Sequence, residues 1–268
     1  MKKTLITLMA LASCAMGETT AVTLGDAIAA IPNVTDQNAS VDISSDTTAY
    51  TGVTLTMNLK ADEFMTALID SGVNKNTYAL ATAQIGTALY IGPAIRYNSS
   101  TNNTLSSAYA VYSTNASGSA ANGMEGMSNG YGPSSWTKDG ASFNSAFSQE
   151  AVNSWGYDAT TGTSNVEKMV LTLTYASGAA GGSTYMTVVL NDGTTHEYSG
   201  QIGTGFKFTY SDVLGVSANA DLVDSVYLFG SVLTASEVQS IHQSIPEPAT
   251  ATLSLLALAG LAARRRRK

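Results

Sequence analysis

The sequence predicts an all-β protein in which short antiparallel strands form a β-sandwich, with one short helix near the end of the body. Several segments alternate between apolar and polar residues, which is the pattern of a strand with one buried face. Turn-forming Gly, Asn, Asp and Ser residues separate these segments. Many short strands with a single helical segment are typical of a sandwich.

The first group of expected strands lies in the N-terminal half of the body. Residues 53–59 (VTLTMNL) alternate apolar and polar positions, so we expect a half-buried strand. Residues 65–70 (MTALID) are expected to be its partner strand. Residues 77–83 and 87–97 are predicted as the next strands, with the turn QIG at 84–86 between them.

A long segment rich in Ser, Asn, Gly and Ala follows at residues 98–163. One strand is expected within it, at 106–114 (SSAYAVYST). The remainder is expected to be loop because glycine recurs throughout it. Loops of this length are usually functional or mobile.

Regular structure is expected to resume at residue 166. Residues 169–175 alternate in the manner of a strand. Residues 184–190 and 195–200 are predicted to form a hairpin around the Asn-Asp-Gly turn at 191–193.

The body is expected to end with a strand at 223–233 and a helix that begins after Thr234. Thr234 is the expected N-cap, and Glu237 stands at the N3 position of a capping box. Val238 and Ile241 then give the helix one apolar face.

The charge distribution argues against nucleic acid as a partner. The whole chain has a net charge of −7, but many basic residues lie at its two ends. Between residues 22 and 245 there are six basic residues against 18 acidic ones, a balance of −12. Such a body repels phosphate backbones, whereas cations or neutral sugars are suitable ligands. Cys14 is the only cysteine, so an intrachain disulfide and a thiolate metal site are excluded.

Residues 1–21 have the organisation of a secretory signal peptide, with a basic start, an apolar run and small residues after it. Cleavage after Gly17 or after Ala21 fits this pattern. A second interpretation is open, because LASC at 11–14 resembles a lipobox in which Cys14 would be lipidated. The sequence therefore predicts export by either route.

Residues 245–268 form a separate C-terminal segment with three features in a fixed order. A proline-bracketed glutamate is followed by the uncharged run 249–263 and by an arginine cluster. As a helix the uncharged run would be ~22 Å long. Snorkelling of the flanking side chains would let it enter a ~30 Å hydrocarbon core. The arginines would then stay on the cytoplasmic side of the inner membrane.

This order of features resembles the PEP-CTERM sorting signal. The resemblance implies recognition by an exosortase-type transpeptidase, removal of the tail, and delivery of the body to the cell surface or extracellular matrix. The sorting residues that it implies are Pro246, Glu247 and Pro248, with Arg264, Arg265, Arg266 and Arg267 as the membrane stop.

Two stretches of the body, residues 22–244, are similar to LamG-like, concanavalin A-type jelly rolls. DLVDSVYLFGSVLTASEVQSI at 221–241 is similar to their closing strand and helix. The strand, turn and strand at 170–198 are similar to their paired central strands. The resemblance implies a jelly-roll sandwich over residues 41–244, but a fold by itself defines no activity.

LamG-like domains often hold calcium, which takes about six to eight oxygen ligands. The residues that could supply such oxygens here are Asn191, Asp192, Asp221 and Asp224, with Asp212 as a further carboxylate. The alternative is that Asn191 and Asp192 only build a turn, and that Asp224 begins a strand.

Four aromatic residues of the Gly-rich and Ser-rich region could stack on the apolar faces of sugar rings. They are Tyr131, Trp136, Trp155 and Tyr157. A polysaccharide is therefore one candidate partner. The alternative is that these residues close the edge of the sandwich as buried plugs.

No arrangement of residues predicts catalysis. A glycosidase requires two carboxylates that flank the glycosidic bond, but Asp62 and Glu63 are adjacent and would point to opposite faces of a strand. His196 and His242, the only histidines, have no partner at informative spacing and are expected on the surface. The sequence therefore predicts an exported, non-enzymatic sandwich of the envelope or matrix that could bind carbohydrate. The alternatives are a purely structural or adhesion protein and a divergent glycoside hydrolase.

Overall fold

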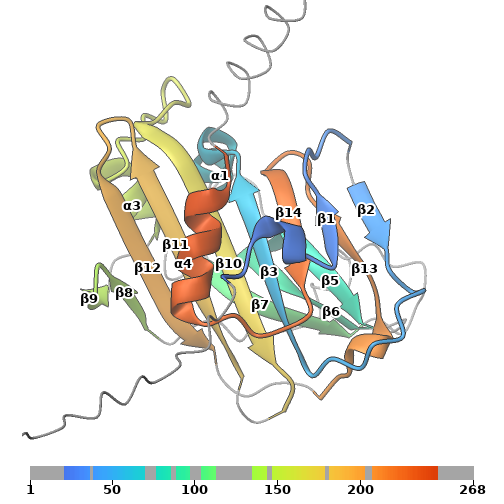
Figure 1. The fold of residues 1–268 in the computed structure, drawn as a ribbon. Helices are drawn as coiled ribbons and strands as arrows, with labels where there is room; N and C mark the ends of the chain where they lie inside the picture. Colours follow the sequence, from blue (N-terminus) through green and yellow to red (C-terminus); the bar gives the residue numbers. More distant parts are fainter. Residues whose placement is uncertain are drawn as a thin grey trace, which may run out of the picture.

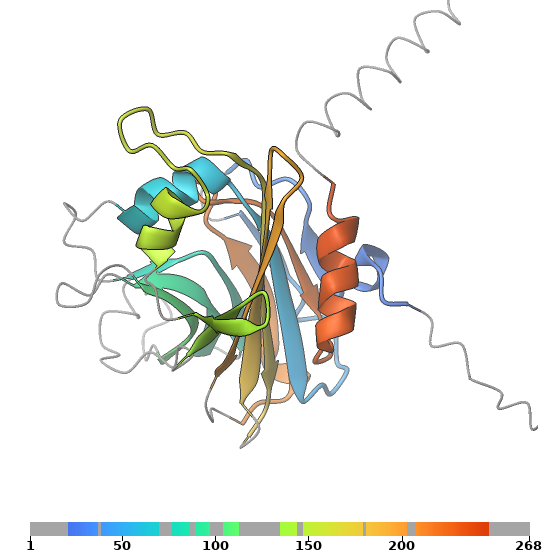
Figure 2. The ribbon, with the colours of Figure 1, turned by 90° about the vertical axis from the view of Figure 1, so that its left-hand side faces the viewer.

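Two antiparallel β-sheets stack face to face, and one helix crosses the outer face of the larger sheet (Figures 1 and 2). This computed structural model describes residues 21–36, 39–69, 77–85, 89–96, 104–112, 135–143, 147–178, 181–202 and 207–246. The predicted all-β sandwich is confirmed at this level, and its two layers are consistent with a jelly roll.

The larger sheet has eight strands, and its long central strands are rich in Val, Leu, Thr and Tyr. Side chains of these types favour the extended backbone of a packed sheet. Across the sheet the strands are β1 (Ala29–Ile31), β14 (Val223–Phe229), β3 (Gly52–Leu59), β10 (Val166–Ala176), β11 (Gly182–Leu190), β12 (Thr195–Ile202), β8 (Trp136–Lys138) and β9 (Ala141–Phe143).

The smaller sheet has six strands. Gly92 lies so close to the neighbouring strand that an added Cβ would come within 1.9 Å of the Ala81 carbonyl oxygen, so the pairing requires glycine there. Across the sheet the strands are β2 (Ala39–Asp42), β13 (Val213–Ala218), β5 (Ala81–Ile85), β6 (Leu89–Arg96) and β4 (Thr77–Ala79), and β7 (Thr104–Tyr112) also pairs with β6.

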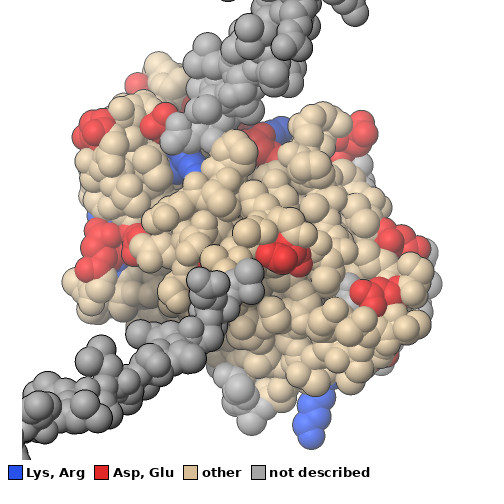
Figure 3. All heavy atoms as spheres, in the orientation of Figure 1, with Lys and Arg blue, Asp and Glu red and all other residues tan. Residues whose placement is uncertain are grey.

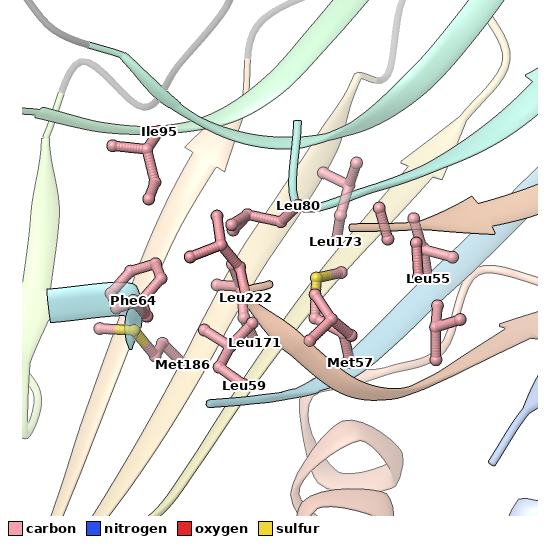
Figure 4. Packing of buried hydrophobic residues seen from close by; sticks show 14 of the residues in the cluster. Leu55, Met57, Leu59, Phe64, Leu80, Ile95, Leu171, Leu173, Met186 and Leu222 are labelled. Atoms are coloured by element: carbon pink, nitrogen blue, oxygen red, sulfur yellow. The ribbon is translucent and has the colours of Figure 1, made fainter. Parts of the chain in front are cut away.

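The main hydrophobic core lies between the two sheets. Leu55, Met57 and Leu171 of the larger sheet meet Leu80 and Ile95 from the smaller one (Figure 4). All five side chains are buried. Burial of a side chain of this size contributes roughly 1.5–3 kcal/mol, so this layer is a major source of stability.

Helix α1 (Ala61–Ile69) occupies the segment in which a strand was expected at 65–70, and that prediction is wrong. Phe64, Met65 and Leu68 are fully buried. Their spacing places all three on one side of a helix, whereas a strand would place Met65 on the face opposite Phe64 and Leu68. As a result β3 pairs with β10 and β14, which are distant in the sequence.

Strand β3 is buried on both faces, whereas its alternation predicted one buried face. Its polar residues Thr54 and Thr56 lie on the side that is covered by helix α4 (Ala235–Ser244). Thr54 Oγ1 donates to the Ser231 carbonyl oxygen at 2.8 Å, and Thr56 Oγ1 lies 2.8 Å from Thr172 Oγ1. These hydrogen bonds replace water, which is what allows hydroxyl groups to be buried.

Most of the other predicted strands and the capped helix are confirmed, including the hairpin of β11 and β12 with Gly193 at φ +83°. The strand predicted at 77–83 is divided into β4 and β5, and the turn predicted at 84–86 is wrong because Gln84 and Ile85 belong to β5. The segment expected to be mostly loop also contains β8, β9 and helix α3 (Phe147–Asn153), which were not predicted. Two short 3-10 helices, η1 (Leu24–Asp26) and η2 (Tyr210–Asp212), complete the described elements.

Among the described residues, none of the helices is both long and apolar enough to cross a membrane. The predicted helix at 249–263 and residues 1–20 of the predicted signal peptide lie outside the described part of the chain.

Candidate sorting-signal junction

Helix α4 lies across the outer face of the larger sheet and is the last described element of the chain (Figure 1). Thr234 Oγ1 accepts from the Glu237 amide, and the Glu237 carboxylate accepts from the Thr234 amide, so the predicted capping box is confirmed. The apolar side of the helix packs on the sheet in a second hydrophobic cluster. This cluster comprises Val170, Tyr227, Phe229, Leu233, Val238, Ile241 and Ile245.

His242 lies on the buried side of α4, at 2% exposure, so the prediction of a surface histidine is wrong. Its Nε2 lies 2.7 Å from Thr172 Oγ1, and its Nδ1 lies 2.7 Å from Thr187 Oγ1. Burial, together with the nearby charge of Lys168, lowers the pKa of His242 to about 3, so the imidazole is neutral. The signal was present in the sequence, because His242 follows Val238 by four residues and shares its helical face.

Lys168 holds Ile245, the first residue of the predicted C-terminal segment, against the larger sheet. Its Nζ donates to the Ile245 carbonyl oxygen at 2.6 Å, and the two residues are 7% and 2% exposed. The Ile245 amide donates to the Ile241 carbonyl oxygen at 3.2 Å, which closes the final turn. Pro246 is the next residue and is exposed. Outside the described residues lie the other predicted sorting residues: Glu247, Pro248, Arg264, Arg265, Arg266 and Arg267.

The fold and this junction define a β-sandwich body in which Ile245 is the last buried residue among those described. A family model described as the PEP-CTERM protein-sorting motif matches residues 244–268. A comparison with curated proteins finds no match. The motif implies an exported, surface-directed protein that is processed by an exosortase. The matched segment overlaps the folded body at Ser244 and Ile245.

A groove of about 370 Å³ lies between α4 and β12, and it was not predicted. The face of the molecule that carries α4 is largely uncharged, with scattered acidic and a few basic side chains (Figure 3). Glu197 and Gln239 are hydrogen-bonded to each other at the groove, and Tyr185 is partly exposed there. Hydroxyl groups also line it, from Thr137, Thr187, Ser199 and Ser236.

The described aromatic residues that were candidates for sugar stacking are buried. Trp155 is 0% exposed, and Trp136 and Tyr157 are also buried, so none offers a free ring face. Trp155 Nε1 donates to the Tyr198 hydroxyl at 3.0 Å. These three aromatic residues are part of the buried core, as the alternative interpretation of them as buried plugs predicted. Tyr131 lies outside the described residues.

A partly buried ion pair adjoins this aromatic cluster and was not predicted. Lys138 Nζ contacts Glu150 Oε1, which also accepts from the Tyr198 hydroxyl at 2.7 Å. Burial alone would raise the pKa of Glu150, but hydrogen bonds from the Lys138 amine and the Tyr198 hydroxyl, among others, hold it below its usual value. A general acid at neutral pH needs a raised pKa, so the lowered pKa of Glu150 argues against that one role.

Two of the residues considered for calcium build a turn. Asp192 Oδ1 accepts from the Thr194 amide at 2.9 Å in the exposed hairpin turn that also contains Asn191. Asp212 is similarly engaged, because its Oδ2 accepts from Thr209 Oγ1 at 3.1 Å. The contact of Asp192 matches the turn-forming alternative that was open for Asn191 and Asp192.

The other candidate ligands lie near helix α1. Asp62 and Glu63, which were expected on opposite faces of a strand, are both in the first turn of α1 and line a pocket of about 500 Å³ with Asp221. Burial raises the pKa of Asp224, Lys60 opposes that shift, and the charge of Glu63 adds to it. Within the described ranges, no group of three or more His, Cys, Asp or Glu side chains is arranged to hold a metal ion. The four predicted ligands therefore do not form one site.

Proposed function

We propose that the protein is an exported, non-catalytic β-sandwich of the cell envelope or extracellular matrix that is delivered by an exosortase-type transpeptidase. The observation that carries this proposal is the position of the sorting motif relative to the fold. The match begins at residue 244, and Ile245, one residue later, is the last buried residue among those described. Removal of the chain beyond Pro246 would therefore take nothing from the described core.

A structural or binding role is supported by how the body uses its buried polar groups. Glu150 is engaged with Lys138 and Tyr198, and His242 is held by two threonine hydroxyls. Side chains held in this way are suited to fixing the fold rather than to attacking a substrate. A divergent glycoside hydrolase is the alternative, and release of reducing sugar from polysaccharide by the purified protein would favour it.

The intact mass of the protein recovered from the producing cells tests the proposal. We expect a chain that ends at or beyond Pro246 but before the arginine cluster, with any mass that the transpeptidase adds. Glu247→Ala should keep the tail, whereas Glu167→Ala, which changes an exposed glutamate of the body, should be processed normally. A wild-type chain that still ends at Lys268 would make the tail a permanent anchor and would refute delivery to the matrix.

We also propose carbohydrate as the ligand class of the groove between α4 and β12. Hydroxyl, amide and carboxylate groups suit a neutral ligand that is rich in hydroxyl groups, and Tyr185 supplies an aromatic surface. The volume of about 370 Å³ lies within the range of small-ligand sites. A purely structural or adhesion role is the alternative.

Binding to a glycan array separates these two roles. We expect the wild-type protein to bind one class of glycan and Gln239→Ala to bind it ~10-fold more weakly, because the substitution removes hydrogen bonds at the groove. Asp192→Ala, in the β11–β12 turn, is the control and should bind as the wild type does. A wild-type protein that binds no glycan would favour the purely structural role.

A further inference from the structure

The end of the body is fastened to the larger sheet by three kinds of contact. Lys168 Nζ donates to the Ile245 carbonyl oxygen at 2.6 Å. The Ile245 side chain is buried in one cluster with Val238 and Ile241. His242, in the same turn, is hydrogen-bonded to threonines of β10 and β11. Separation of the Lys168 ammonium group from the Ile245 carbonyl oxygen is costly, because a buried hydrogen bond to a charged group is lost.

This attachment restricts which residues an enzyme can take into its cleft. Enzymes that cleave peptides commonly bind the substrate as an extended strand that follows their own main chain. Residues 235–244 are helical, and Ile245 is buried and held through its carbonyl oxygen. Neither part can be bound in extended form unless α4 first leaves the sheet. Pro246 is the first exposed residue after this point.

We propose that Lys168 is a positioning residue for tail processing, which holds Ile245 against the sheet and so confines cleavage to a bond on the C-terminal side of Pro246. The inference rests on the proposed function, since it requires that the tail is processed. In that step the peptide C–N bond breaks and its carbonyl carbon passes to an amine or hydroxyl acceptor, or to water. The acceptor's proton goes to the nitrogen of the departing tail, and the mature body keeps α4 docked.

Two matched lysine variants of the full chain test this role. Lys168→Met removes the ammonium group and keeps an apolar side chain of similar length. Lys60→Met is the control, because Lys60 Nζ also donates to a main-chain carbonyl oxygen at 2.6 Å, that of Ala220, at a site away from α4. With a broad-specificity protease, we expect trimming of the wild type and Lys60→Met to stop at or beyond Pro246. Cleavage within residues 241–245 should be ~10- to 100-fold faster in Lys168→Met, because the undocked state is more populated.

The producing cells supply the second measurement, the C-terminal residue of the mature protein. We expect ends at or beyond Pro246 in the wild type and additional ends within 241–245 in Lys168→Met. If Lys168→Met does not fold, Ile245→Ala, which shortens the anchored side chain, replaces it with the same expectation.

Two results would overturn the positioning role and leave sorting intact. One is equal trimming of Lys168→Met and the wild type, and the other is a wild-type mature end at Ile245 or earlier. A wild-type chain that retains Lys268 is distinguishable from both by its mass, and it would overturn the proposed function together with the role of Lys168.

Discussion

His242 makes the stability of the protein depend on pH below neutrality. In the unfolded chain the pKa of the imidazole has its ordinary value of 6.5, whereas burial in the folded protein lowers it to about 3. Between these values the unfolded state binds a proton that the folded state does not, so acidification favours unfolding. The full stability is present above pH 6.5, and the gap between the two pKa values corresponds to ~5 kcal/mol that is lost as the pH falls toward about 3.

The effect of His242 is best measured between about pH 7.5 and about pH 5. The carboxyl groups of the unfolded chain titrate mainly at lower pH, near ~4, and so contribute little in this interval. We expect the free energy of unfolding to fall by ~2 kcal/mol across the interval. Urea denaturation followed by the fluorescence of the buried Trp136 and Trp155 measures it. His242→Gln cannot take up this proton and should show little dependence on pH. His196→Gln changes the other histidine and should keep the wild-type dependence.

Two outcomes would refute the reasoning. A dependence on pH that persists unchanged in His242→Gln would assign the effect to other groups. A flat profile of the wild type would mean that His242 has the same pKa in the folded protein as in the unfolded chain, and that water reaches the interface between α4 and the sheet.

Two further substitutions test contacts that the fold depends on. Glu150→Gln keeps the shape of the side chain but removes the charge that pairs with Lys138, and we expect the free energy of unfolding at neutral pH to fall by ~1–3 kcal/mol. Folding lowers the pKa of Glu150, so the stability that its charge contributes is present above the unfolded pKa and is lost as the pH falls through the folded pKa. If Glu150→Gln destabilised the protein as much at about pH 2 as at neutral pH, the role of the charge would be contradicted. Thr234→Ala removes the N-cap of α4 and should cost ~1 kcal/mol in urea denaturation. Thr234→Ser should retain most of that stability, and an unchanged midpoint in Thr234→Ala would contradict the capping role.

Features that depend on neighbouring residues could be predicted from the sequence. The hairpin around residues 191–193 follows from the turn preference of Asn-Asp-Gly. The start of α4 follows from Thr234 and Glu237, whose side chains satisfy the first amides of the helix locally. The sorting motif at 244–268 is likewise a contiguous pattern, so its match required no knowledge of the fold.

Features that depend on what packs against a segment could not be predicted in the same way. A short apolar run such as 65–70 fits a strand or a helix equally well, and the packing of Phe64 and Leu68 in the core decides for the helix. Trp136 and Trp155 were candidates for ligand contact only because their surroundings were unknown, and tertiary packing buries both.

The junction between α4 and the sorting motif depends both on a local sequence pattern and on tertiary packing. The sequence alone determined that a sorting motif occupies residues 244–268, because the motif is local and lies in one continuous segment. Only the tertiary structure decided that Ile245 is withheld from solvent, because its carbonyl oxygen is bound by Lys168, 77 residues earlier in the chain. The hydrogen bond between Lys168 and Ile245 forms only when α4 packs against β10. A pattern of neighbouring residues cannot predict such a contact.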